Sequence, residues 1–408
     1  MFRKSLFWLH LIAGVIAGLV ILVMSVTGFL LMYERQIVAF AERNLVPPAA
    51  PGAVRLTPEE LVAKVQESGQ PLPASITFEN RENAPVRFSY GREKAFFVDP
   101  YTGANLGEGT RLRHFFHEVT DWHRWLANRE IGKPITGACN AAFLFLAITG
   151  AYLWLPRQWK WSSIKPVLFF RRTGTSKARN FNWHNVIGIW STPILIIVTA
   201  TGMVISYPWA NNLIYKLTGT EAPAPRTGRP GGPGGGRGRG PAETTLPAIG
   251  LTPFVQAIQT YAPDWKSITL NLPAKGGQSG QRREGEGRRN NGEARPEGGE
   301  RRQPALTATV STAHDRHLYA RNTVTLSLAD GSILKWEGYQ NYNTGRKIRS
   351  WIRGLHTGEA GGIVGQTLAG LASLGGAFLV YTGLALSWNR FFAKKRKTSV
   401  EKTTASVP

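Results

Sequence analysis

The sequence predicts an α-helical membrane protein with four transmembrane helices in a pseudo-two-fold duplicated bundle and small α+β modules outside the membrane. Three observations support this fold class. Four stretches of the 408 residues are long and apolar, most of the net positive charge lies on one side of them, and histidines recur at matching offsets in the two halves. Together these features indicate a multi-pass membrane protein rather than a soluble basic protein.

Each apolar stretch carries almost no charge and reaches the length of about 20 residues that a bilayer-spanning helix needs. The first is too long for the apolar region of a signal peptide, and no small-residue cleavage site follows it, so we expect it to be retained. The fourth is rich in Gly and Ala, as packed membrane helices are. The four stretches are 6–33, 135–155, 186–207 and 361–388.

The net charge of +23 would fit a nucleic-acid-binding protein, but its distribution fits membrane topology better. The N-terminal stub, the loop 156–182 and the tail 389–408 together hold 15 Lys and Arg and a single acidic residue. Because cytoplasmic segments of membrane proteins are enriched in Lys and Arg, we expect both termini inside and segments 34–134 and 208–360 outside. Lipid is therefore an expected partner, and nucleic acid is not.

Cysteine usage excludes several kinds of site. The chain has one cysteine, Cys139. It therefore cannot form an intramolecular disulfide, a Cys-rich zinc site, an iron–sulfur cluster or a covalent C-x-x-C-H haem attachment.

The two outer segments have the same predicted plan, a helix followed by strands. In the first, Thr57 is the expected N-cap, Pro58 is the first helical residue, and three alternating strands follow. In the second, a helix at 251–262 precedes strands within 266–272, 307–312, 318–328 and 332–338. Two inserts without an apolar face, 222–243 and 274–304, are expected to be disordered.

The predicted spans occupy 1–33, 135–155, 183–207 and 351–388, the last together with its entry segment. Outside the cytoplasm we expect a first outer module at 34–110, a His-bearing interfacial helix at 111–134 and a second outer module with the two inserts at 208–350. The basic loop 156–182 and the tail 389–408 are expected to be cytoplasmic.

A hidden duplication connects the two halves. Every span carries a Thr-Gly pair near its distal end, which we interpret as a small-residue site for close helix packing. In each half one histidine precedes its threonine by 17 residues and the next histidine precedes its threonine by 26. These pairs are His10 and Thr27, His123 and Thr149, His184 and Thr201, and His356 and Thr382.

Parallel repeats are related by an axis along the membrane normal, which places equivalent residues at equal depth. His10 is then expected to face His184 near the cytoplasmic surface, and His123 to face His356 near the outer surface. Histidine near hydrocarbon is costly, and two facing imidazoles suit the axial positions of a non-covalent b-type haem. The sequence thus favours two bis-histidine haems over four interfacial histidines that reach toward water.

Neighbouring residues leave alternatives open. His117 could replace His123 as the outer ligand, or bind a second metal together with His114, although the repeat register favours His123. Arg124 and Arg353 lie close to the outer histidines and could hold haem propionates, or could simply anchor the chain at the interface.

Several segments resemble a known family: HN-x-x-G-x-W in the third span, LHTGE before the fourth, and FVDPYTGANLGE at the end of the first outer module. The chain is similar to the PepSY-associated transmembrane family, which includes iron-regulated membrane proteins and periplasmic ferric-siderophore reductases. The resemblance implies PepSY-like outer modules, the bacterial inner (cytoplasmic) membrane, and b haems held by His10, His123, His184 and His356.

The resulting hypothesis is a haem-dependent oxidoreductase in iron acquisition, in which no side chain is catalytic. It would accept electrons from a cytoplasmic reductase or the quinol pool. It would reduce a ferric siderophore or another periplasmic acceptor. The alternative is a non-enzymatic PepSY membrane protein that binds peptides or regulates proteases.

Overall fold

The computed structural model describes residues 1–91, 94–156, 158–172, 174–223, 244–274, 304–315 and 321–392. The two inserts that the sequence predicts to be disordered lie almost entirely outside these residues. The chain divides into two compact units. The first comprises Met1–Met32, Val119–Met203 and Ile363–Pro408, and the second comprises Tyr33–Glu118 and Val204–Gly362.

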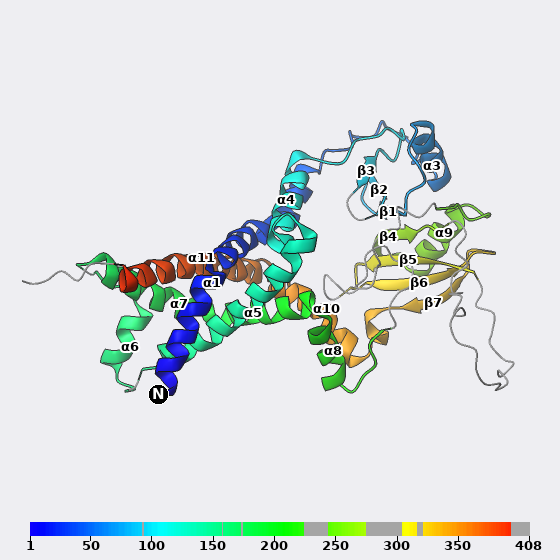
Figure 1. The fold of residues 1–408 in the computed structure, drawn as a ribbon. Coiled ribbons are helices and arrows are strands. Elements are labelled where there is room, and N and C mark those ends of the chain that lie inside the picture. The colour runs from blue at the N-terminus through cyan, green and yellow to red at the C-terminus, as the bar shows by residue number, and fades with distance from the viewer. Residues whose placement is uncertain are drawn as a thin grey trace, which may run out of the picture. The chain divides into compact units, whose positions relative to one another are not determined.

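The first unit is a bundle of four long apolar helices (Figure 1). All four are long and apolar enough to cross a membrane. Three contain their predicted span to within one residue, and the last three residues of the first span form a 3-10 turn after α1. A short helix, α6 (Trp161–Leu168), lies in the loop between the second and third. The long helices are α1 (Phe2–Leu30), α5 (Arg129–Trp154), α7 (Ser176–Ser206) and α11 (Gly362–Phe391).

Small residues allow these helices to approach closely. A Cβ atom at Gly376 of α11 would lie 2.9 Å from Oγ of Ser25 in α1. A Cβ at Gly375 would similarly collide with Ser191 of α7, so α11 packs against both helices. Asn140 of α5 is buried and donates to the main-chain oxygen of Thr199 in α7 at 3.0 Å. The interior therefore combines close backbone approach with satisfied polar groups.

Contacts at the chain ends define one end of the bundle, where the start of α1 lies beside the ends of α5 and α11. Arg3 donates to the main-chain oxygens of Leu153 at 2.6 Å and Leu155 at 3.0 Å, so the start of α1 lies beside the end of α5. The guanidinium of Arg390, at the end of α11, lies 4.9 Å from the ring centroid of Trp8. The starts and ends of these helices therefore alternate, as expected for consecutive spans.

A sharp turn separates α5 from the preceding helix, α4 (Arg111–Trp125). Leu126 and Ala127 have positive φ angles of 49° and 60°, and the Asn128 side chain accepts from the first amides of α5. A Cβ atom on Gly132 would lie 1.6 Å from the carbonyl oxygen of Trp125. The turn thus requires a residue without a side chain at position 132.

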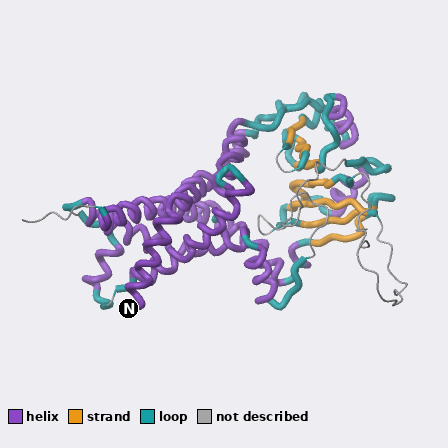
Figure 2. The backbone as a smooth tube through the Cα atoms, in the orientation of Figure 1, coloured by secondary structure: helices purple, strands orange, loops and turns teal. Residues whose placement is uncertain are grey.

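The second unit contains one seven-stranded antiparallel sheet of order β3-β2-β1-β4-β5-β6-β7 (Figure 2). Strands form where alternation predicts them, in both outer segments. They are β1 (Ser75–Glu79), β2 (Val86–Ser89), β3 (Ala95–Val98), β4 (Trp265–Asn271), β5 (Ala305–Thr312), β6 (Asn322–Ser327) and β7 (Ile333–Glu337). Because β1 pairs with β4, the two outer segments share a single sheet, an arrangement that the sequence does not predict.

Two helices pack on the same hydrophobic core, α3 (Pro58–Glu67) and α9 (Thr252–Tyr261). The predicted N-cap is confirmed, because Thr57 accepts from the amide of Glu60 and Glu60 accepts from the amide of Thr57. In α9 the capping acceptor comes from the other segment, since Glu59 accepts from the amides of Leu251 and Thr252. One helix of the unit therefore caps the other.

The remaining helices of the second unit are α2 (Glu34–Ala41), α8 (Pro208–Leu217) and α10 (Thr344–Thr357). Short 3-10 turns lie at Leu31–Tyr33, Tyr339–Asn341 and Glu359–Gly361. Residue Gly358 ends α10 in the left-handed conformation, with φ of 76°.

Candidate functional site

Two of the predicted ligand histidines make the same contact with a threonine of a neighbouring span. Nδ1 of His10 in α1 lies 2.8 Å from Oγ1 of Thr149 near the end of α5. Nδ1 of His184 in α7 lies 2.9 Å from Oγ1 of Thr382 near the end of α11. In each case the partner is a residue of the Thr-Gly pairs that the sequence analysis singled out. The imidazoles are half-buried and the threonines are fully buried.

The hydroxyl contacts determine the protonation state of both rings. The single hydroxyl proton of Thr149 is donated to the main-chain oxygen of Phe145 at 2.7 Å. That of Thr382 is donated to the main-chain oxygen of Phe378 at 2.8 Å. With its proton so engaged, each hydroxyl oxygen is left to accept from the histidine, which assigns the proton to Nδ1. The assigned tautomer leaves the lone pair on Nε2, the nitrogen that binds a metal.

A third histidine has the same arrangement with an additional acceptor. Nδ1 of His123, in α4, lies 3.0 Å from Oγ1 of Thr27 and 3.0 Å from the main-chain oxygen of Met24. A carbonyl oxygen can only accept, so Nδ1 of His123 is a donor. The Thr27 hydroxyl gives its own proton to Val23 at 2.6 Å. The His123 ring is thus fixed as the Nδ1–H tautomer by two acceptors of α1.

Each contacting threonine is followed by a glycine that lies beside the imidazole. A Cβ atom on Gly150 would be 3.4 Å from Cε1 of His10, and one on Gly28 would be 3.3 Å from Cε1 of His123. The corresponding distance from Gly383 to His184 is 3.6 Å. The sequence alone predicts these pairs to be sites of close helix packing. The recurrence of the Thr-Gly pairs is visible in the sequence. It does not reveal that such a pair contacts a histidine of another helix, with the threonine beside Nδ1 and the glycine beside Cε1.

The contacts lie at two levels of the bundle. His10 and His184 contact the distal ends of α5 and α11, the end of the bundle where α1 begins. The end of α11 lies beside the start of α1, because Arg390 contacts the ring of Trp8. His123 contacts Thr27, close to the other end of α1. One level therefore holds two of the predicted ligands and the opposite level holds a third.

The other predicted residues lie on α4 and α10. His117 is exposed on α4, as is His114. Arg124 is exposed and its guanidinium lies 4.4 Å from the ring centroid of Trp125. His356 is partly buried in the last turn of α10, and Arg353 is exposed one turn earlier. The predicted facing of His123 and His356, and the propionate role of the two arginines, stay predictions.

Among the described residues, no group of three or more His, Cys, Asp or Glu side chains could hold a metal ion. A bis-histidine haem needs only two protein ligands per iron, because the porphyrin supplies the other four. The donor set at the His10 level, two neutral imidazoles with Nδ1 protonated, therefore fits an axial haem pair. It does not fit an all-protein metal cage.

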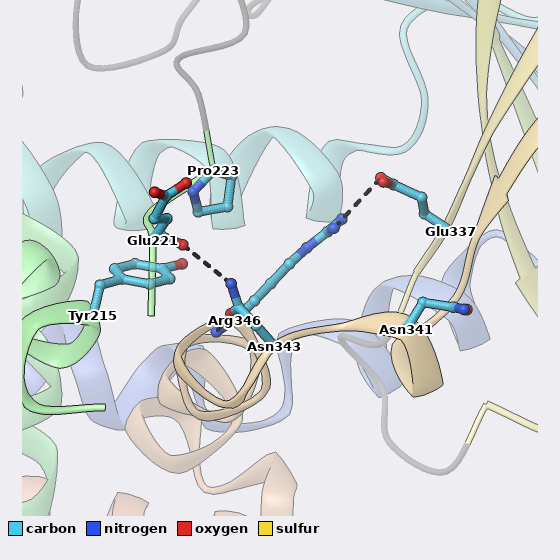
Figure 3. Close-up of a pocket in the computed structure, with 7 residues that line it drawn as sticks. All are labelled: Tyr215, Glu221, Pro223, Glu337, Asn341, Asn343 and Arg346. Atoms are coloured by element: carbon cyan, nitrogen blue, oxygen red, sulfur yellow. Dashed lines mark hydrogen bonds and ion pairs between the residues drawn. The ribbon is translucent and has the colours of Figure 1, made fainter. Parts of the chain in front are cut away.

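A separate polar hollow lies in the second unit (Figure 3). Arg346 reaches Glu337 at 3.5 Å, and Asn343 donates to the main-chain oxygen of Glu221 at 3.1 Å. A hydrogen bond from Lys335 lowers the pKa of Glu337, although burial opposes the shift. The hollow contains none of the predicted haem ligands; its lining residues are Tyr215, Glu221, Pro223, Glu337, Asn341, Asn343 and Arg346.

Comparison with known proteins gives one result for nearly the whole chain. A family model described as the PepSY-associated TM region matches residues 7–390. No curated protein matches the chain significantly.

Proposed function

Because the chain belongs to the family of PepSY-associated TM regions, we propose that this multi-pass membrane protein is a di-haem b-type electron carrier that reduces an acceptor outside the cytoplasm. The proposed acceptor is a ferric siderophore, and the proposed role is iron acquisition at the bacterial inner membrane. Both termini are cytoplasmic in this proposal, as the positive charge of the stub, loop 156–182 and tail suggests.

The observation that carries the proposal is the contact of Nδ1 of His10 and His184 with a buried threonine hydroxyl of another helix. Histidines that bind metals almost always donate their second ring N–H to a neighbouring acceptor, which orients the ring and fixes the tautomer. Both rings have that donor contact, with hydroxyls 2.8 and 2.9 Å away.

The repetition of the contact supports the proposed duplication. His10 and His184 each precede the threonine of their own span by 17 residues, and each contacts the threonine of the following span. In the same register His123 corresponds to His356. The proposal assigns these two residues to the second haem, and this assignment follows from the sequence register alone.

Bound haem supplies one-electron chemistry at neutral pH, and the chain supplies the ligands, their orientation and an apolar surrounding. The electron donor is proposed to be a separate cytoplasmic reductase or the quinol pool. One-electron reduction of a ferric siderophore releases iron because hard oxygen ligands bind Fe(III) more tightly than Fe(II). Arg124 and Arg353 are proposed to pair with carboxylates of the haem.

Haem content tests the proposal directly. Protein purified from haem-replete cells should show a Soret band that shifts and sharpens when dithionite is added. His10→Ala and His184→Ala should each remove about half of the haem, and the double variant should lose no more than either single one. His314→Ala changes an exposed histidine of the second unit and should retain the full haem content.

The outcomes separate the hypotheses. A colourless wild-type preparation would exclude the haem proposal and favour the non-enzymatic PepSY alternative, which pull-down with extracytoplasmic peptides and proteases would then test. Loss of all haem only in the double variant would mean that His10 and His184 ligate different irons. Reduced protein mixed with a ferric siderophore and a ferrous chelator should be reoxidised as the ferrous complex forms.

A further inference from the structure

We propose that Thr149 and Thr382 are positioning residues that fix the tautomer and tune the electron donation of His10 and His184, with Thr27 acting in part on His123. This inference rests on the proposed haem function. It concerns the threonine hydroxyls that accept from the histidines, and the haem content of histidine variants does not test their role.

The argument begins with the direction of the hydrogen bonds. In each case the threonine hydroxyl donates to a carbonyl four residues earlier in its own helix, at 2.6 to 2.8 Å. This leaves the oxygen lone pairs for the imidazole Nδ1–H. A hydroxyl whose proton is already engaged is a better acceptor than an isolated one, because consecutive hydrogen bonds polarise each other. The result is a chain from histidine to hydroxyl to helix carbonyl.

The strength of the acceptor affects the ligand. A ligating imidazole that donates Nδ1–H to a strong acceptor becomes more electron-rich and stabilises the ferric state. A neutral hydroxyl gives a weaker effect than a carboxylate would. Replacing the hydroxyl with a methyl group should therefore remove electron density from the ligand and raise the haem midpoint potential.

The three histidines differ in a way that makes the inference testable within one molecule. At His10 the acceptor of Nδ1 is the side chain of Thr149. At His123 a main-chain carbonyl, that of Met24, lies at the same 3.0 Å distance as the Thr27 hydroxyl, and His184 likewise bonds the main chain at Leu379 beside Thr382. Because no side-chain substitution removes a carbonyl, Thr27→Val and Thr382→Val should each have a smaller effect than Thr149→Val.

The chain also offers a matched control. Thr199 is buried in α7 with 2% of its surface exposed, and its hydroxyl donates to the main-chain oxygen of Leu195 at 2.6 Å. It therefore has the same intrahelical bond as the three positioning threonines, and the structure shows no histidine bonded to its hydroxyl. Thr199→Val reports the cost of losing a buried hydroxyl alone.

The experiment compares these four valine variants with Thr149→Ser and Thr382→Ser in the full-length protein. Haem affinity should fall about 10- to 100-fold in Thr149→Val, the usual effect of losing an outer-shell partner, and less in Thr382→Val and Thr27→Val. The potential of the affected haem should rise, and serine should restore both values. In haem-free protein, ¹⁵N shifts should show the Nδ1–H tautomer at His10 and His184, and a mixture of tautomers at His10 in Thr149→Val.

The failures of the two proposals are distinguishable. If wild-type protein bound no haem, the proposed function would fail, while the ¹⁵N shifts would still test the tautomer. If wild-type protein bound haem but Thr149→Val and Thr382→Val matched Thr199→Val in affinity, potential and tautomer, the positioning role would be overturned and the haem function would stand.

Discussion

Thr77 and Thr269 face each other at the centre of the seven-stranded sheet, with their hydroxyl oxygens 3.0 Å apart. Each is the last residue of a Ser-Ile-Thr triplet, the first in β1 and the second in β4. Equivalent residues of the two outer segments thus meet across one antiparallel pair of strands. The sheet is continuous because the edge strand of each segment is covered by the other.

A shared sheet predicts one cooperative unfolding transition for the two outer segments. Ile76 and Ile268 are fully buried in one hydrophobic core. Ile76→Ala and Ile268→Ala should each lower the free energy of unfolding by about 2–5 kcal/mol, because a buried cavity results. Calorimetry of the full-length protein in detergent should show a single shifted transition for the outer unit. Thr325→Ala, on the opposite face of β6, is the control, and two separate transitions would contradict the prediction.

Glu59 predicts acid sensitivity of the same unit. Burial favours its neutral form, but hydrogen bonds from Thr252 and from the amide of Leu251 outweigh burial and lower its pKa below the ordinary 4.5. A carboxyl with a lowered folded-state pKa contributes stability above its unfolded-state pKa, and that stability is lost as pH falls through the folded value.

Glu59→Gln should therefore cost about 1 kcal/mol at neutral pH, the usual value of a helix N-cap, and less at low pH. Thermal unfolding between pH 7 and pH 3 measures both effects. Glu67→Gln changes a carboxylate at the other end of α3 and should not alter the pH profile. An equal loss of stability at both pH values would show that the Glu59 charge is unimportant.

Gly132→Ala should severely destabilise the turn between α4 and α5. The added methyl group would overlap the carbonyl oxygen of Trp125, which belongs to the main chain and cannot rotate away. We expect a loss of about 3 kcal/mol or more, at the upper end for overpacked sites. The melting temperature in detergent is the measurement. Gly174→Ala, where a Cβ meets nothing within 4 Å, is the control, and equal melting temperatures would refute the predicted clash.

Arg113 and Glu42 should be coupled more strongly than an ordinary surface pair. Two nitrogens of Arg113 contact Glu42, at 2.7 and 2.5 Å, and the Glu42 side chain is only 9% exposed. A double-mutant cycle with alanine should give a coupling energy of about 1–3 kcal/mol. The exposed pair Arg81 and Glu79 should give less than about 1 kcal/mol. Similar values for both pairs would show that burial of Glu42 does not strengthen the interaction.

Much of the fold was predictable because the signals are local. Apolar length predicts the four spans, and alternation predicts the strands of both outer segments. The pairing of β1 with β4 was not predictable, because it joins strands about 190 residues apart and no turn sets their register. The turn at Leu126 and Ala127 also gave no signal, since neither residue type ordinarily adopts positive φ.

The candidate site was predictable in part. The offsets of 17 and 26 residues identified both the histidines and the Thr-Gly pairs. They could not show that His10 contacts Thr149 rather than Thr382, because that depends on which helices are neighbours. Side-chain contacts between helices follow from packing in three dimensions, and periodicity along one helix does not specify the partner.

The separation of the two histidine levels has an electrical consequence. His10 and Thr27, the residue that contacts His123, stand 17 positions apart on one continuous helix, which corresponds to about 26 Å at 1.5 Å per residue. This is most of the roughly 30 Å thickness of the hydrocarbon core. A charge that moves between the levels therefore crosses most of the transmembrane voltage, worth about 2.3 kcal/mol per 100 mV for a full crossing. In the orientation and function proposed above, outward electron movement in a cell whose interior is negative is driven by that voltage, and the proposed iron reduction would consume part of the membrane potential.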